Sequence, residues 1–203
     1  MLRTYIKIAW RNILKHKGYS TINIFGLSLG MAVTLMIGLW VADELNYNDY
    51  YKNKNQIAQV YQNINYNGEI DTDNAIPRPL EFALREEFKD KFKNISMASW
   101  EGERFMKVED NTLVMHGYSV QPEFGNIIDL QFISGQSEAL NDSNSLLLSQ
   151  TAATTLFGDE DPTGKMLTVD NEYKMMVAGI FKDIPEGNDF AGLDYLMPWS
   201  LYA

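Results

Sequence analysis

The stretch that decides the fold is Ile22-Asn-Ile-Phe-Gly-Leu-Ser-Leu-Gly-Met-Ala-Val-Thr-Leu-Met-Ile-Gly-Leu-Trp40, inside an uncharged run from Gly18 to Ala42. At a rise of about 1.5 Å per residue, about twenty helical residues cross the hydrocarbon layer of a bilayer, which is about 30 Å thick. Leu, Ile, Val and Phe dominate the run, and a helix satisfies its own backbone groups, so a few polar side chains are tolerated. The stretch predicts a transmembrane helix over residues 18–42.

The flanking charges predict the orientation of this span. The residues before it are basic, with no acid before residue 43, and the residues just after it are acidic. The positive-inside rule therefore predicts a cytoplasmic N-terminus, a location in the cell (inner) membrane, and an extracytoplasmic or periplasmic segment after about residue 43. The alternative is a cleaved signal peptide, but its apolar core would be about 7–15 residues long, and Trp40-Val-Ala-Asp43 is a poor cleavage site.

The first seventeen residues form a basic amphipathic pattern. Cations recur at intervals of four, and apolar side chains occupy the opposite side. This pattern is typical of a helix that lies on the inner membrane surface and contacts membrane lipid, and Gly18 offers a hinge into the span. The alternative is an ordinary basic flank that only orients the span. The predicted membrane-surface residues are Arg3, Lys7, Arg11 and Lys15.

Within the span, small residues fall at a strict spacing of four: Gly26, Gly30, Thr34 and Gly38. Small residues at this spacing line one face of a helix and let a second helix approach closely. The alternative is that glycine is simply common in membrane helices. We favour helix packing, with a partner helix from the same parent protein or from another subunit.

The charge composition excludes one class of function. Residues 43–203 hold 12 Lys and Arg against 27 Asp and Glu, so the segment after the span is strongly acidic. Such a segment would repel the phosphates of nucleic acid, which is therefore not an expected partner. The chain contains no cysteine, which excludes disulfides, thiolate metal sites and a thiol nucleophile.

The rest of the chain mixes strands and helices without a regular βα alternation, which predicts an α+β domain over residues 43–203. Turn residues at Asn67-Gly68, Asp110-Asn111 and Asp170-Asn171 separate apolar runs. The expected domains are residues 1–17, 18–42 and 43–203, the last with two possible subdomains and incomplete. The predicted strands are 56–66, 96–108, 112–121, 145–148, 165–169 and 173–181, and the predicted helices are 79–92 and 149–156.

No motif predicts catalysis, a cofactor or a metal. Gly158-Asp-Glu-Asp-Pro-Thr-Gly164-Lys165-Met166 has five residues between its glycines, no hydroxyl after the lysine and three acids, so it is not a phosphate-binding loop. His16 and His116 are the only histidines and are expected on opposite sides of the membrane. Asp71-Thr-Asp73-Asn lacks the glycine and distal glutamate of a calcium loop. A carboxylate pair is not excluded, but no pair stands out.

Three stretches together resemble the N-terminal part of MacB/FtsX-type permease subunits of ABC transporters. The opening Ile8-Ala-Trp-Arg-Asn-Ile-Leu-Lys-His-Lys-Gly-Tyr-Ser-Thr-Ile-Asn-Ile-Phe-Gly-Leu-Ser-Leu-Gly30 is similar to the family's basic helix and Gly-rich first span. Asp43-Glu-Leu-Asn-Tyr-Asn-Asp49 with Asn55-Gln-Ile-Ala-Gln-Val-Tyr61 resembles the entry into the MacB-like periplasmic core domain. The third is Ser149-Gln-Thr-Ala-Ala-Thr-Thr-Leu-Phe-Gly-Asp-Glu-Asp-Pro-Thr-Gly-Lys165 followed by Val177-Ala-Gly-Ile-Phe-Lys-Asp-Ile-Pro185.

This resemblance implies a non-catalytic subunit whose spans pair with a cytoplasmic ABC ATPase, which alone would bind ATP. It also implies a dimer, further transmembrane helices of the parent permease, and an extracytoplasmic domain that acts on macrolides, peptides or lipoproteins or on a cell-envelope partner. Family members carry at least four spans and this sequence has one, so a fragment or split product is expected. The alternatives from other classes are a single-pass membrane-anchored sensor or scaffold and, less favoured, a membrane-anchored hydrolase.

Overall fold

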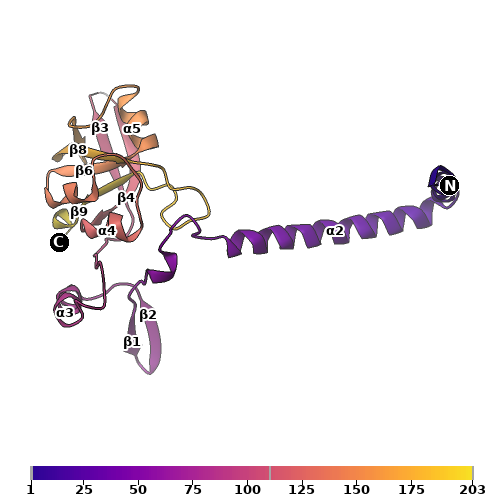
Figure 1. The fold of residues 1–203 in the computed structure, drawn as a ribbon, viewed down its shortest axis with the longest axis horizontal. Coiled ribbons are helices and arrows are strands. Elements are labelled where there is room, and N and C mark those ends of the chain that lie inside the picture. Colours follow the sequence, from indigo (N-terminus) through magenta and orange to yellow (C-terminus); the bar gives the residue numbers. More distant parts are fainter. Residues whose placement is uncertain (1, 110, 203) are drawn as a thin grey trace. The chain divides into compact units, whose positions relative to one another are not determined.

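The computed structural model describes residues 2–109 and 111–202, and its fold is shown in Figure 1. The chain divides into two compact units between Tyr47 and Asn48. The first unit holds helices α1 and α2, and the second holds strands β1 to β9 with the remaining helices. One N-terminal apolar helix followed by a mixed α/β domain confirms the predicted α+β fold class.

Helix α2 (Lys17–Leu45) is the one helix in the described residues that is long and apolar enough to cross a membrane, with a mean hydropathy of 2.1 in its most apolar window. None of its residues is buried in the structure, as suits a helix whose surroundings are lipid or other helices. The helix continues past the predicted end at Ala42 through two acids, and Asn46 caps its C-terminus.

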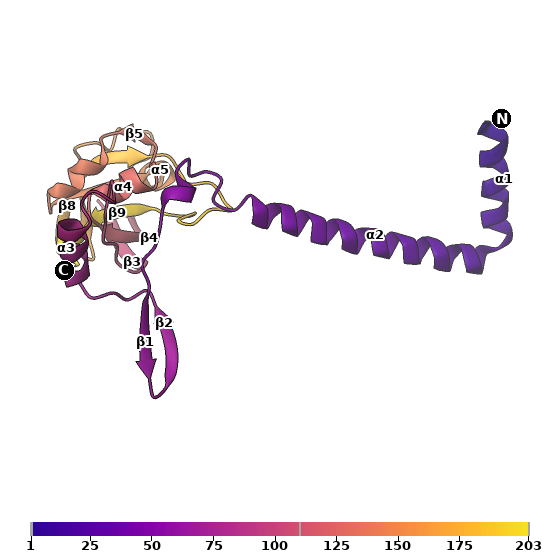
Figure 2. The ribbon, with the colours of Figure 1, turned by 60° about the horizontal axis from the view of Figure 1, so that its bottom comes forward.

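The bend before the span lies at His16 rather than at Gly18. Helix α1 (Leu2–Lys15) ends one residue earlier, and the His16 backbone (φ −117°, ψ 55°) is not helical. The chain direction changes there, as Figure 2 shows, while Gly18 lies inside α2. Backbone hydrogen bonds continue on both sides of His16. The His16 N–H donates to Asn12 O (3.1 Å), and the Ser20 N–H donates to His16 O (2.9 Å).

In the second unit the hydrogen-bonded ladders close into a ring of six strands. The order is β8-β6-β9-β4-β3-β7, and β7 pairs back with β8. Closure depends on the length of β8, which pairs with β7 up to Met176 and with β6 from Met176 onward. The pairs β4–β9 and β6–β8 are parallel, and the other ladders of the ring are antiparallel. The strands are β3 (Gly102–Val108), β4 (Asn111–Val120), β6 (Ser145–Ser149), β7 (Met166–Val169), β8 (Tyr173–Phe181) and β9 (Tyr195–Pro198), and β5 (Phe132–Ser134) adds to β8 outside the ring.

Alternation along the central strands produces two separate cores. Leu146 and Leu148 of β6 lie in one cluster and Leu147 lies in the other, because successive side chains of a strand point to opposite faces. Strand β6 is buried along its whole length, which explains its unbroken apolar run. Helix α5 (Gln150–Phe157) packs into the first core, while α4 (Glu123–Ile127) and the 3₁₀ helix η2 (Ser137–Asn141) accompany the second.

The segment before the ring forms smaller elements. Strands β1 (Gln62–Tyr66) and β2 (Glu69–Asp73) make a two-stranded hairpin around Asn67-Gly68 and pair only with each other in the described structure. Helix α3 (Pro79–Glu87) follows and ends five residues before the predicted end at Phe92. Short 3₁₀ turns lie at Lys54–Gln56 (η1) and Trp199–Leu201 (η3).

Several predicted elements differ from the observed ones. The strand expected over 56–66 begins only at Gln62, and that expected over 96–108 begins at Gly102. Strands β2, β5 and β9 were not predicted. The β3–β4 pairing agrees with the predicted hairpin, although Asp110 of its turn lies outside the described residues. The β7–β8 hairpin turns at Asp170 and Asn171, as predicted.

Candidate functional site

The residues that follow helix α2 after a two-residue gap are held by a loop from the far end of the sequence. Asn48 Nδ2 donates to Asp189 Oδ2 (2.8 Å), and the backbone N–H of Asp189 donates to Asn48 Oδ1 (2.7 Å). The backbone N–H of Asn48 also donates to Gly187 O (3.1 Å). Asn48 adopts a positive φ of 63°, which asparagine tolerates better than most residues because its short polar side chain bonds locally. We call Asn48, Tyr50 and Tyr51 together with Gly187, Asn188 and Asp189 the connector clamp.

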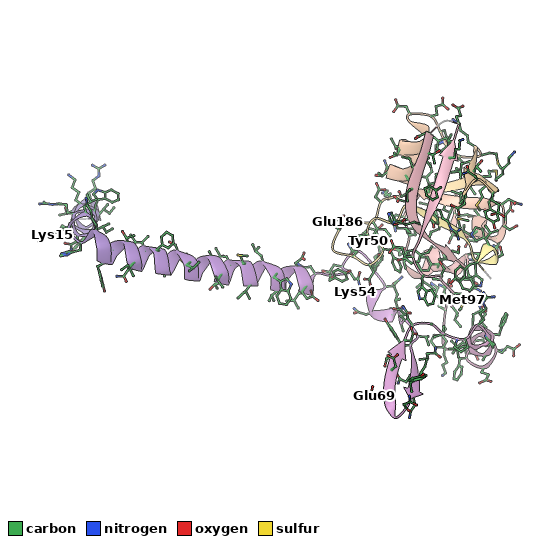
Figure 3. The ribbon with its side chains drawn as sticks, turned by 180° about the vertical axis from the view of Figure 1, so that it is seen from behind. Lys15, Tyr50, Lys54, Glu69, Met97 and Glu186 are labelled. Atoms are coloured by element: carbon green, nitrogen blue, oxygen red, sulfur yellow. The ribbon has the colours of Figure 1, made fainter. Side chains whose placement is uncertain are left out.

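The two tyrosines complete the connector clamp. The backbone N–H of Tyr50 donates to Asn188 Oδ1 (3.2 Å), and the buried Tyr51 donates its hydroxyl hydrogen bond to Asp189 O. The two rings pack edge to face with centroids 5.3 Å apart. Figure 3 marks Tyr50 on the connector and Glu186 on this loop. Burial, with a smaller contribution from Asp129, raises the pKa of Tyr50.

Internal hydrogen bonds also help to hold the loop in shape. Asn188 Nδ2 donates to Pro185 O (3.0 Å) and Glu186 O (3.2 Å). Because Asn188 Oδ1 accepts from the backbone N–H of Tyr50, both the donor and the acceptor of this amide are used. Gly187 and Gly192 take positive φ values of 77°, where glycine has no steric penalty.

The aromatic side chain of Phe190 packs the loop against the second core. Phe190 has a positive φ of 65°, a conformation that costs about 1–2 kcal/mol for a residue with a side chain. Its ring packs edge to face against Tyr118 (5.5 Å) and Phe124 (5.2 Å), and the contacts of this partly buried ring offset the backbone cost. Burial first, then the nearby charges of Glu101 and Asp189, raise the pKa of Tyr118. Phe190 therefore adds a packed contact between the loop and the second core, to which Tyr51 of the connector also belongs.

The predicted helix-packing residues lie on an open face of α2. A Cβ added at Gly26, Gly30 or Gly38 would meet no atom within 4 Å outside the helix backbone. Thr34 Oγ1 donates to Gly30 O (2.9 Å), so its hydroxyl is satisfied within the helix. A shallow groove brings together Gly26, Gly30 and Thr34 with Leu27, Met31 and Leu35, whereas Gly38 lies outside it.

The predicted membrane-surface residues Arg3, Lys7, Arg11 and Lys15 all lie on α1 and are exposed. Within the described residues the structure records no ion pair for any of them. Figure 3 shows Lys15 at the end of α1 that adjoins α2. The four cations are therefore available to an external partner, and lipid contact stays a prediction.

The stretch that superficially resembles a phosphate-binding loop has a structural role. Lys165 pairs with Glu160 and lies over the Phe157 ring at 5.6 Å, so it closes its own loop. The pairing lowers the pKa of Glu160. Among the described residues, no group of three or more His, Asp or Glu side chains is placed to hold a metal ion.

The sequence pattern predicts the basic helix and the glycine stripe, whose roles stay predictions, but it does not predict the connector clamp. The two sides of the clamp are 141 residues apart, and each looks like ordinary turn sequence. The only local signal is the density of turn residues in Pro185-Glu-Gly-Asn-Asp189, which indicates a loop and not its partner.

The family model that matches this chain is the MacB-like periplasmic core domain, over residues 20–203. The chain belongs to this family. Domains of this family are parts of ABC transporter permease components, which are non-catalytic. A comparison with curated proteins finds no match.

Three solved structures are similar at low identity. A domain described as a permease protein from Porphyromonas gingivalis is 23% identical (TM-score 0.48; 60% of this chain and 57% of that one are covered). The periplasmic region of MacB from Actinobacillus actinomycetemcomitans is 16% identical (TM-score 0.44; 56% and 53%). The extracellular domain of the noncanonic ABC-type transporter YknZ from Gram-positive bacteria is 17% identical (TM-score 0.49; 62% and 64%). The chain thus covers between about half and two thirds of the length of these relatives, and its family assignment rests on the family model alone.

Proposed function

We propose that this chain is the first span and outer domain of an ABC transporter permease, in which the connector clamp transmits movement of the span to the outer domain. The observation that carries the proposal is the pairing of Asn48 with Asp189. Asn48 lies three residues after Leu45, the last residue of α2. Because the clamp begins so soon after the helix, little flexible chain is available to absorb a displacement of the helix end. In this proposal ATP is bound and hydrolysed by a cytoplasmic ATPase subunit, and the outer domain acts on exported or extracted macrolides, peptides or lipoproteins or on an envelope partner.

The proposal includes an orientation with α1 inside and the outer domain outside, and the absence of cysteine makes it testable. Lys7→Cys and Lys174→Cys each introduce one exposed thiol. A membrane-impermeant maleimide applied to intact cells should label the Lys174→Cys variant and spare the Lys7→Cys variant until the membrane is opened. Labelling of Lys7→Cys alone in intact cells would overturn the orientation and with it the proposed function.

The pairing with an ATPase is tested by affinity purification of the tagged protein from its own membranes. An ABC ATPase should co-purify, and ATP should change the exchange of amide hydrogens in residues 185–192 of the clamp loop. A protein that carries no ATPase, and whose clamp does not respond to ATP, would support the single-pass sensor or scaffold instead.

We also propose that Gly26, Gly30, Thr34 and Gly38 pack against another membrane helix, and that Arg3, Lys7, Arg11 and Lys15 contact anionic lipid. The open space at the three glycines supports the first proposal, and the exposed cations of α1 support the second. Gly30→Ile should weaken association of α2 helices in a membrane reporter assay by about tenfold, whereas Leu29→Ile, on another face, should leave it unchanged. Equal association of the two variants would contradict the packing proposal.

A further inference from the structure

Residues 57–100, which contain the β1–β2 hairpin and α3, contribute almost nothing to the two cores. In this segment only Glu81 and Met97 are buried, and neither belongs to a core cluster. An isolated two-stranded hairpin is marginally stable in water, and contiguous exposed aromatic surface usually marks a site of interaction. Figure 2 shows the hairpin extending away from the strands of the ring. The exposed aromatic side chains of the segment are Tyr61, Tyr66, Phe82, Phe88, Phe92 and Trp100.

One face of the hairpin is acidic and apolar. Its register pairs Ile64 with Asp71 and Tyr66 with Glu69, and Asp73 follows on the same face because side chains of a strand alternate. All five side chains are exposed, Tyr66 by 74%. The three carboxylates are thus arranged along one strand at intervals of about 6.8 Å. We call these five residues the acidic face, and Figure 3 marks Glu69 near the hairpin end.

The turn after α3 carries the complementary chemistry. Phe88-Lys-Asp-Lys-Phe-Lys93 places three lysines in five residues, together with two aromatic rings that are 46% and 47% exposed. Residues 48–203 hold 12 Lys and Arg against 25 Asp and Glu, so this turn is a local exception in a strongly acidic unit. We call residues 88–93 the basic turn.

Neither patch is neutralised by an ion pair within the part of the chain that the structure describes. Across the described residues 2–109 and 111–202 the structure records no ion pair for Lys89, Lys91 or Lys93, nor for the three acids of the acidic face. The carboxylate of Asp73 does accept from the backbone N–H of Ala75 (3.0 Å), which fixes the end of the hairpin without neutralising the charge. Two complementary surfaces therefore lie unused on one segment.

We propose that the acidic face of one copy docks on the basic turn of a second copy, and the reverse, in a two-fold pair. A two-fold interface requires that each contact occurs twice, and a chain that carries both halves of a complementary pair meets this requirement. Two units with a large excess of acids repel each other, and a matched contact between opposite charges reduces this repulsion where the surfaces meet. The aromatic side chains supply part of the area: at exposures of 74%, 46% and 47%, Tyr66, Phe88 and Phe92 of the two copies would bury roughly 500–800 Å², about half of a standard interface.

The charges determine which surfaces meet, because electrostatic complementarity gives specificity more than affinity. The proposal identifies the surface through which the dimer implied by the permease function would form. The contact itself requires no ATPase. Its test is carried out on the purified full chain without an ATPase, so its failure would leave the permease proposal unaffected. Failure of the permease proposal would likewise leave this contact measurable.

The first test is crosslinking of two differently tagged copies in lipid nanodiscs. Asp71→Cys on one copy and Lys91→Cys on the other should react with a short bis-maleimide to give a mixed dimer, at least tenfold more than either variant alone. The matched control is Lys107→Cys with Lys174→Cys, two exposed positions on strands of the ring, which should give no such product. A mixed-dimer yield no higher than that of the control pair would overturn the proposal.

The second test exchanges the charges of the two patches. Its readout is crosslinking at exposed positions beside the patches and not the oligomeric state, because α2 alone can hold two copies together. Lys89→Glu/Lys91→Glu/Lys93→Glu in one variant and Glu69→Lys/Asp71→Lys/Asp73→Lys in the other should each lose the crosslink by tenfold or more. Mixing the two variants should restore it, since both contacts are again between opposite charges. Near-UV circular dichroism verifies folding, and Lys107→Glu/Lys174→Glu is the control.

Two outcomes would overturn the proposal. The first is that both charge-reversed variants crosslink as well as the unmodified chain. The second is that the lysine-reversed variant keeps its crosslink but binds less well to vesicles containing phosphatidylglycerol, which would assign the basic turn to lipid.

Discussion

Asn48 and Asp189 exchange two hydrogen bonds, an amide donating to a carboxylate (2.8 Å) and a backbone N–H donating back to the amide oxygen (2.7 Å). An asparagine offers a donor and an acceptor on one side chain, and this arrangement uses both. No other uncharged side chain of similar length that tolerates a positive φ supplies the same pair of groups. The identity of residue 48 therefore determines how firmly the connector is held.

Asn48→Asp should loosen the connector clamp. The new carboxylate keeps the acceptor and tolerates the positive φ, but it replaces the donor with an oxygen that faces Asp189. We expect a local loss of about 1–3 kcal/mol, seen as faster hydrogen exchange of residues 185–192 in the full chain. Asn53→Asp, an exposed change in the same connector, is the control. Unchanged exchange in Asn48→Asp would show that the clamp does not hold this loop.

Arg85 attaches α3 to Ile95 and to the residues that follow β4. Its guanidinium pairs with the buried carboxylate of Glu81 and donates to Ile95 O (2.5 Å), and also to Glu123 (3.2 Å) and Gln121 (3.2 Å). These carboxylates and hydrogen bonds raise the pKa of Arg85 against the opposing effect of burial. The hydrogen bonds, and not apolar packing, are the main contacts that hold α3 in place.

Arg85→Met should therefore destabilise the domain by about 2–3 kcal/mol, because it leaves the Glu81 carboxylate buried without its cation. The double variant Glu81→Gln/Arg85→Met should recover part of that loss, since it removes the unpaired charge as well. Denaturant unfolding of the full chain, followed by tryptophan fluorescence, measures both. A double variant less stable than Arg85→Met alone would show that charge burial is not the cause.

The sequence predicted well the elements that local chemistry determines. Ser149 caps α5 as expected, accepting from Ala152 N–H at 3.1 Å, and Asp170 and Asn171 take the positive φ values (52° and 58°) of a tight hairpin turn. Strand β9 was missed because Tyr195-Leu-Met-Pro198 is short and ends in proline, and because its order comes from pairing with β4 and β6. Closure of the ring and the connector clamp depend on contacts between distant residues, which no local pattern encodes.

The buried phenol of Tyr195 predicts a loss of stability in alkali. Burial raises its pKa to about 12, although nearby Arg104 acts in the opposite direction, and its hydroxyl donates to Gly102 O (2.9 Å). In the unfolded chain the phenol ionises near the ordinary tyrosine pKa of 10.0, while the folded protein retains the proton until about pH 12. The unfolded state therefore binds fewer protons between these values, so stability is complete below pH 10 and falls by up to about 2 kcal/mol as the pH rises.

Tyr195→Phe should cost about 1 kcal/mol at pH 7 through the lost hydrogen bond, and should reduce the decline of the unfolding free energy between pH 8 and pH 11. Denaturant midpoints at the two pH values give this difference. Tyr173→Phe, at an exposed position on β8, is the control and should keep the decline of the unmodified chain. The same decline in Tyr195→Phe would mean that Tyr195 does not account for it.

Gly179 lies where β5 and β6 approach β8 most closely. A Cβ at this position would lie 2.7 Å from Ser134 O, 3.0 Å from Leu147 Cδ2 and 3.1 Å from Gly135 Cα, all closer than ordinary contacts. The register between β6 and β8 also shifts beside this residue. The close approach thus joins the extra strand β5 to the ring, and it requires a residue without a side chain.

Gly179→Ala should destabilise the domain by about 1–3 kcal/mol, because the backbone of β5 and the core side chain Leu147 must both move. Gly179→Val, with two more methyl groups in the same space, should prevent the second core from forming at all. Thermal melts of the full chain in detergent, followed by near-UV circular dichroism, report the packing of the aromatic side chains, including those of this core. Lys174→Ala, an exposed change on the same strand, controls for the effect of substitution in β8. A melting temperature of Gly179→Ala equal to that of Lys174→Ala would show that β5 moves aside without cost and that the ring does not depend on this contact.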